Sequence, residues 1–137
     1  MKFLAVVLFF VSAVFSVTPA LAQNSAAYRA CTAKAKAQPE LNSCAAEEAT
    51  RVDAELNAIY RELLAKAVEE PDAVAKIKAA ERAWVLYRDA YMEAMYPAED
   101  KQAEYGSIYP MDAALLRAKL TQHQIAALKD LVEQYSE

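Results

Sequence analysis

Alanine dominates this chain, and glycine is almost missing from it. Beyond residue 22, alanine occupies 27 of the remaining 115 positions, and Gly106 is the single glycine. Alanine has the highest helix propensity and glycine one of the lowest, so the backbone is strongly biased towards α-helix. No segment sustains the apolar–polar alternation of a strand. The sequence therefore predicts an all-α fold, and its length predicts a single domain.

The first 22 residues have the layout of a secretory signal peptide. Lys2 precedes an apolar stretch over residues 3–17, and the small-x-small triplet Ala20-Leu21-Ala22 directly precedes Gln23. An uncleaved membrane anchor is the alternative, but the apolar stretch is shorter than the roughly 20 residues that span a bilayer. We therefore expect cleavage before Gln23, a helical domain of residues 23–137 in the periplasm or secreted, and no membrane attachment afterwards.

The remaining domain is acidic. It carries 14 Lys and Arg residues against 19 Asp and Glu residues, a net charge of −5. Such a surface repels the phosphates of nucleic acids and attracts cationic partners. We expect a cationic protein partner and no nucleic-acid partner.

Cys31 and Cys44 are the only two cysteines. In a small exported domain, an even pair predicts one disulfide. Closing a loop of this size stabilises the fold by about 3 kcal/mol in the chain-entropy model. The alternative is a redox or metal-binding pair, but the spacing is not CxxC and the lone His123 cannot complete a zinc site. The sequence therefore predicts a structural disulfide, with no metal and no cofactor.

Four prolines divide the domain into one short and three longer helical segments. We expect these segments over residues 25–37, from Asn42 or Ser43 to about residue 68, over 71–95 and over 112–135. Apolar residues of the second segment recur at spacings of four and three, which predicts one buried stripe. The short connection at residues 69–70 predicts that the second and third segments form an antiparallel hairpin. The expected architecture is a small antiparallel helical bundle.

Arg88 interrupts the apolar stripe of the third segment, and a buried guanidinium needs a partner. The hairpin register places it level with residue 51, so we predict an ion pair with Asp53, with Glu48 as the second choice. Asn57 and Tyr60 are expected as polar neighbours. An anion-binding site at Arg88 is the functional alternative.

Side chains that could support catalysis are sparse. His123 is the sole imidazole, and its polar surroundings predict an exposed helical position. A nucleophilic triad needs a base beside Ser, Thr or Cys, and a bundle metal site needs Glu-x-x-His, where this chain has Leu120. We predict no catalytic residues and no enzymatic activity.

The long irregular segment between the last two helices is the candidate contact loop. Rigid aromatic side chains are frequent anchors of binding surfaces, and loops frequently carry function. The alternative is a plain connection whose aromatic rings pack back on the bundle. The candidate residues are Tyr96, Tyr105, Gly106, Ser107, Ile108 and Tyr109.

Several motifs together resemble the LprI-like lysozyme inhibitor family. The two most specific are Asp53-x-Glu55-Leu56-Asn57-x-x-Tyr60 and Ala83-Trp84-x-x-Tyr87-Arg88-Asp89, accompanied by Leu41-Asn42-Ser43-Cys44-Ala45 and Gly106-Ser107. The resemblance spans about residues 30–128. It implies a small exported protein that inhibits a lysozyme or a related muramidase by non-covalent occlusion.

One departure from the family pattern concerns cysteine. Many members carry a second cysteine pair, where this chain has Tyr91-Met92-Glu93 and Leu115-Leu116-Arg117. The loop over residues 96–111 is therefore less tethered than in those relatives.

A second hypothesis comes from a different class of protein. A small, acidic, helical domain with a modest core also suits a periplasmic holdase or envelope-stress protein that binds unfolded chains. That hypothesis predicts exposure of apolar surface on acidification.

Overall fold

The computed structural model describes residues 24–136, and every regular element in that range is helical. The elements are α1 (Ala26–Thr32), α2 (Gln38–Lys66), α3 (Pro71–Met95), α4 (Lys101–Tyr105), the 3₁₀ turn η1 (Gly106–Ile108) and α5 (Tyr109–Gln134). The predicted all-α bundle of one short and three long helices is confirmed. The segment expected to be irregular additionally forms α4 and η1. The expected leader lies outside the described residues.

Prolines begin helices in this fold more than they separate them. Pro39, Pro71 and Pro110 each occupy one of the first two positions of a long helix. These positions tolerate proline because their backbone N–H groups have no partner within the helix. As a result α2 begins at Gln38 and α5 at Tyr109, both earlier than the sequence patterns predict.

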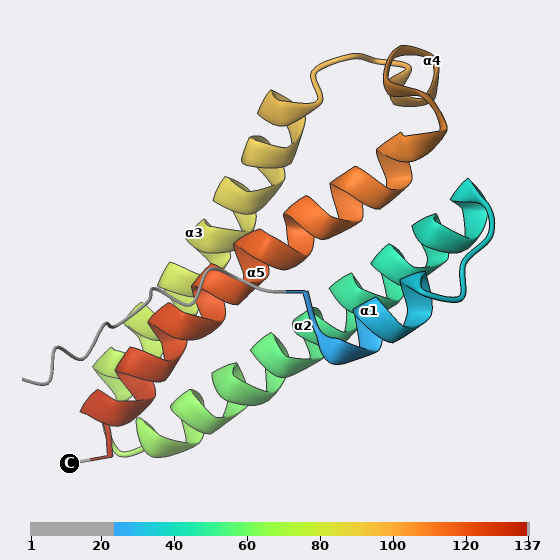
Figure 1. Ribbon diagram of the computed structural model, residues 1–137. Coiled ribbons are helices and arrows are strands. Elements are labelled where there is room, and N and C mark those ends of the chain that lie inside the picture. Colours follow the sequence, from blue (N-terminus) through green and yellow to red (C-terminus); the bar gives the residue numbers. More distant parts are fainter. Residues whose placement is uncertain (1–23, 137) are drawn as a thin grey trace, which may run out of the picture.

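The three long helices alternate in direction, so α2 and α5 run parallel to each other and α3 runs antiparallel to both (Figure 1). The closest packing is between α2 and α5, which lie side by side along most of their length. The alanine content explains this approach, because small side chains let two helix axes come close together. The main core joins buried residues of α2 and α5, chiefly Ala49, Val52, Leu56, Leu63, Ala118, Ile125 and Leu128.

Helix α3 is attached to this pair mainly through its N-terminal half. Ile77 is its one buried residue, and Val74 and Trp84 pack partly buried against the core. The predicted stripe continues to Tyr91 and Met95, but these two side chains are 37% and 47% exposed. The C-terminal half of α3 therefore has much less protein against it than its apolar pattern suggests.

The short helix α1 covers the beginning of α2. Its residues pair with α2 in reverse order, so the two helices are antiparallel, and the predicted disulfide between Cys31 and Cys44 is formed. Tyr28 is buried beside Cys44, with Met111 and Leu115 of α5 packed against the same cluster. A second, smaller core therefore joins α1, α2 and α5. Within residues 24–136, no helix is both long and apolar enough to cross a membrane.

Candidate functional site

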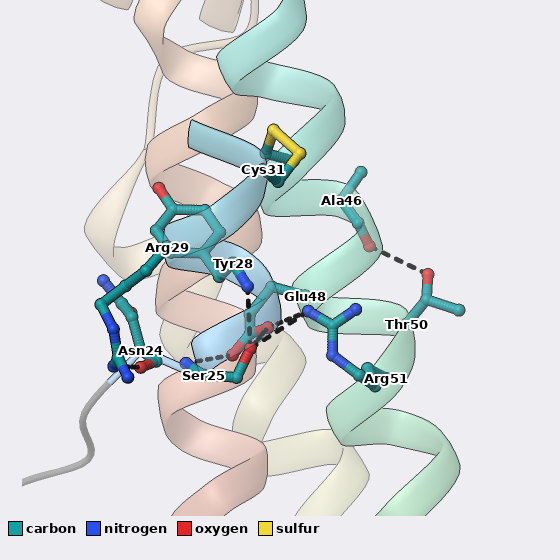
Figure 2. Close-up of polar contacts among 10 residues, drawn as sticks. Asn24, Ser25, Tyr28, Arg29, Cys31, Ala46, Glu48, Thr50 and Arg51 are labelled. Carbon is teal, nitrogen blue, oxygen red and sulfur yellow. Dashed lines mark hydrogen bonds and ion pairs between the residues drawn. A yellow bond between two sulfur atoms is a disulfide. The ribbon is translucent and has the colours of Figure 1, made fainter. Parts of the chain in front are cut away.

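Glu48 is the most buried charged residue among residues 24–136, with a side chain that three donors approach at the start of α1 (Figure 2). The Ser25 backbone N–H donates to Glu48 Oε1 at 3.0 Å, and the Ser25 hydroxyl donates to Oε2 at 2.5 Å. The Arg51 guanidinium pairs with the same Oε2 from one turn further along α2. Ser25 in turn caps α1 by accepting the Tyr28 backbone N–H at 3.0 Å.

The protonation of Glu48 reflects two opposing effects. Burial raises the pKa of the Glu48 carboxyl, but the hydrogen bonds from Ser25 and the hydrogen bond and charge of Arg51 together outweigh burial and lower it below its usual range. The carboxylate is therefore ionised at neutral pH and fixes one end of α1, while the disulfide fixes the other. This cluster secures the packing of α1 on α2.

The predicted pair between Arg88 and Asp53 is not formed, which corrects the sequence prediction. Arg88 instead donates from Nε and Nη2 to Asp89 Oδ1 at 2.9 and 2.7 Å, and its guanidinium lies 5.2 Å from the centre of the Trp84 ring. Glu48, the second choice, is occupied by Arg51 and Ser25.

Asp53 makes its side-chain polar contacts with α5. It pairs with Arg117 and accepts the Thr121 hydroxyl at 3.3 Å. The physical reason is that α5, and not α3, is the nearest neighbour of α2 along this stretch, so acidic residues of α2 meet basic residues of α5. Lys129 Nζ follows the same rule, donating to Glu55 Oε1 at 2.9 Å.

The two remaining members of the predicted polar cluster lie apart from it. Asn57 is exposed, and Tyr60 packs partly buried against the main core. Tyr60 also lines a shallow groove between α2 and α3 together with Val85 and Leu86. The structure therefore does not bring the five predicted residues into one site.

The candidate contact loop folds into an aromatic tip at one end of the bundle, formed by residues 96–109. Three tyrosine rings pack on one another, with centroid distances of 5.3 Å for Tyr96–Tyr105, 5.0 Å for Tyr96–Tyr109 and 5.8 Å for Tyr105–Tyr109. Burial, the negative charge of Asp112 and the two neighbouring phenols raise the pKa of Tyr96. The tyrosines are therefore largely committed to holding the tip together.

Other residues of the aromatic tip face outward. Ile108 is 43% exposed, and Gly106 and Ser107 beside it are exposed as well. Gly106 has φ of 73°, in the left-handed region that favours glycine, and this allows the sharp step from α4 to η1. The Ser107 carbonyl accepts the Asn42 side-chain amide at 3.1 Å, which ties the tip to the start of α2.

Sequence reasoning missed four residues that matter here: Ser25, Arg51, Arg117 and Thr121. Two signals could have revealed some of them. Arg51 is three positions after Glu48, a spacing that places both on one helix face. Thr121 occupies a position of the apolar stripe of α5, where a fully buried hydroxyl needs a polar partner.

Metal ligation has no support in the described part of the chain, where no three His, Cys, Asp or Glu side chains gather closely enough to hold an ion. His123 is exposed on α5, as its polar neighbours predict. The exposed part of the aromatic tip offers the aliphatic side chain of Ile108 beside the tyrosine rings.

Comparison with known protein families shows which family the chain belongs to. A family model described as the lysozyme inhibitor LprI matches residues 31–128, which is most of the chain. The chain belongs to the LprI lysozyme inhibitor family. The match begins at Cys31, contains the disulfide, Asp53 and the aromatic tip, and confirms the resemblance noted in the sequence. The LprI description names an inhibitor and not an enzyme.

The LprI domain is also similar to an uncharacterized protein from Rhizobium meliloti (strain 1021). The two are 36% identical over 73% of this chain and 77% of the relative. No solved structure matches this chain significantly.

Proposed function

We propose that this protein is exported and inhibits a lysozyme or a related muramidase by non-covalent occlusion. The observation that carries the proposal is membership of the LprI family over residues 31–128. The proposal includes removal of residues 1–22 as a leader, which leaves the helical domain in the periplasm or outside the cell. The holdase alternative has no comparable support, because the family description names a lysozyme inhibitor.

Charge supports this choice of partner. Without its leader the chain has 14 basic and 19 acidic residues, so its net charge is negative. A cationic lysozyme would be attracted at long range, which raises the association rate. Salt screens such attraction over a Debye length of about 8 Å at physiological ionic strength. Inhibition should therefore weaken as the salt concentration rises.

The aromatic tip is the contact surface that we assign to this function. Its rings hold each other in place, so little conformational freedom is lost when the tip docks. Ile108 projects from this pre-formed support with 43% of its surface exposed. An aliphatic side chain on a rigid base suits insertion into the cleft of another protein.

The test is a turbidity assay of cell-wall lysis with several types of lysozyme across a salt series. We expect stoichiometric inhibition at low salt, and an Ile108→Glu variant that inhibits at least about tenfold less, because a carboxylate would be buried in the interface. Leu131→Glu is the matched control, since Leu131 is 38% exposed near the end of α5, far along the bundle from the tip (Figure 1).

Two results would count against these assignments. Unchanged lysis by every lysozyme at an excess of the protein would reject the inhibitor function. Equal inhibition by the Ile108 and Leu131 variants would leave inhibition standing but move the contact surface away from the tip.

A further inference from the structure

Helix α3 has an apolar outer face that nothing in the described part of the chain covers. At 100° per residue, eight residues between positions 79 and 94 fall within an arc of about 140°, centred about 110° round the helix from Ile77. All eight are exposed, and none is charged: Ala79, Ala80, Ala83, Leu86, Tyr87, Ala90, Tyr91 and Ala94. Leu86 and Tyr87, midway along its length, are 72% and 56% exposed.

This outer face is unusual for a helix already attached to a core. The inner side of α3 is also largely apolar, through Val74, Ile77 and Trp84. Because Tyr91 lies only about 40° from Ile77 round the helix, the outer face and the inner side form one wide apolar stripe, and the core buries only one edge of it. Large apolar side chains gathered on one face, unlike scattered ones, mark an interaction surface.

The charges beside the outer face indicate what covers it. Arg82 and Glu93 lie on the same flank of α3, beside the two ends of the outer face, and both are exposed. In an antiparallel pair of identical helices, each flank meets the same flank of the other copy. Arg82 of one copy would then face Glu93 of the second, and the contact would occur twice. Glu93 can make this contact in addition to its present one, because Lys101 Nζ donates to its Oε2 and the Glu93 side chain is 70% exposed.

We propose that the outer face of α3 binds a second copy of this chain, in an antiparallel dimer with Arg82 and Glu93 paired across a twofold axis. The alanines permit close approach of the two helices, as they do between α2 and α5. Leu86 and Tyr87 lie near the axis and supply most of the apolar contact.

The size of the outer face sets the strength of this dimer. Sixteen residues of helix extend about 24 Å, and a strip about 10 Å wide on each copy gives a total of roughly 500 Å². Stable complexes bury about 1,200–2,000 Å². The dimer is therefore weak, with a dissociation constant in the micromolar range or above, and it dissociates on dilution.

Sedimentation velocity of the protein, purified after export with its own leader, tests the proposal at concentrations from about 5 to 500 µM, a range chosen for a weak interface. We expect a shift from monomer to dimer as concentration rises. Leu86→Glu should raise the dissociation constant at least about tenfold, because two carboxylates would meet near the axis. Val68→Glu is the matched control, since Val68 is an exposed aliphatic residue (62%) outside the outer face.

A charge exchange tests the antiparallel register. Arg82→Glu and Glu93→Arg should each weaken the dimer, and the double variant should restore it. A monomer at every concentration, or equal effects of the Leu86 and Val68 variants, would overturn the proposal. A double variant weaker than both single variants would overturn the antiparallel pairing. Lysozyme inhibition is measured separately, so the two proposals can fail independently.

Discussion

Replacing Glu48 with glutamine removes one negative charge from the best-buried polar cluster of this fold. Three donors converge on two carboxylate oxygens, whereas glutamine offers one oxygen and an additional donor. One hydrogen bond to a charged group is lost outright, and such a bond contributes about 1.5–3 kcal/mol. Arg51 is 44% exposed and can regain water, so it adds little to the loss. We expect the free energy of unfolding to fall by about 2 kcal/mol. For a domain of this size, that loss corresponds to a melting temperature lower by roughly 8 °C.

The pH dependence of this loss provides the sharper assay. The pKa of Glu48 is lowered in the folded state, so its contribution to stability is complete above the unfolded-state pKa of about 4.3 and disappears as pH falls through the folded-state value. Urea unfolding of both proteins from pH 7 to pH 3 measures the difference directly. The gap between them should be constant down to about pH 5 and should narrow progressively as the pH falls below the unfolded-state pKa of about 4.3.

The neighbouring Glu47 supplies the control for this prediction. It lies on the same helix with an exposed side chain, so Glu47→Gln should change stability by less than about 0.5 kcal/mol. A Glu48→Gln variant as stable as the parent at pH 7 would refute the reasoning. So would a gap that persists unchanged at pH 3, because it would assign the loss to packing and not to charge.

Two further predictions concern the connections between helices. Replacing Cys31 and Cys44 together with serine should lower the free energy of unfolding by about 3 kcal/mol, measured by urea unfolding without reductant, and a reductant should then have no further effect. A double-mutant cycle between Asp53 and Arg117 should give a coupling of up to about 1 kcal/mol, as for a partly exposed pair, whereas the cycle between Asp53 and Arg88 should give none. A larger coupling for Asp53 and Arg88 than for Asp53 and Arg117 would instead support the ion pair that the sequence predicts.

The prolines show why helix existence was predictable and helix boundaries were less so. Alanine content and apolar periodicity act over every turn of a helix, so the long helices follow from local preference. A proline fixes its own φ and restricts the residue before it, and it fits the first turn of a helix as easily as it ends a preceding helix. The sequence pattern therefore predicts boundaries between helices at Pro39 and Pro110, whereas each lies within the first turn of the helix it begins.

The Arg88 prediction shows the same limit at the level of packing. A short connection correctly indicates that α2 and α3 run antiparallel, but it does not state how closely they pack. Alanine appears on several faces of each helix, so the apolar stripe does not identify a unique neighbour. The structure pairs α2 most closely with α5, which assigns Asp53 to Arg117 and leaves Arg88 with Asp89.

Local chemistry in the chain was enough to determine the helices, the disulfide between Cys31 and Cys44 and the family, because propensity, cysteine count and motif are properties of short segments. The tertiary structure alone decided that α2 and α5 lie in parallel, that Ser25 and Arg51 surround Glu48, that three tyrosines close on one another and that α3 keeps an apolar face outward. Each of these depends on which of several nearly equivalent helix faces meet, and that choice is made by the packing of the whole domain.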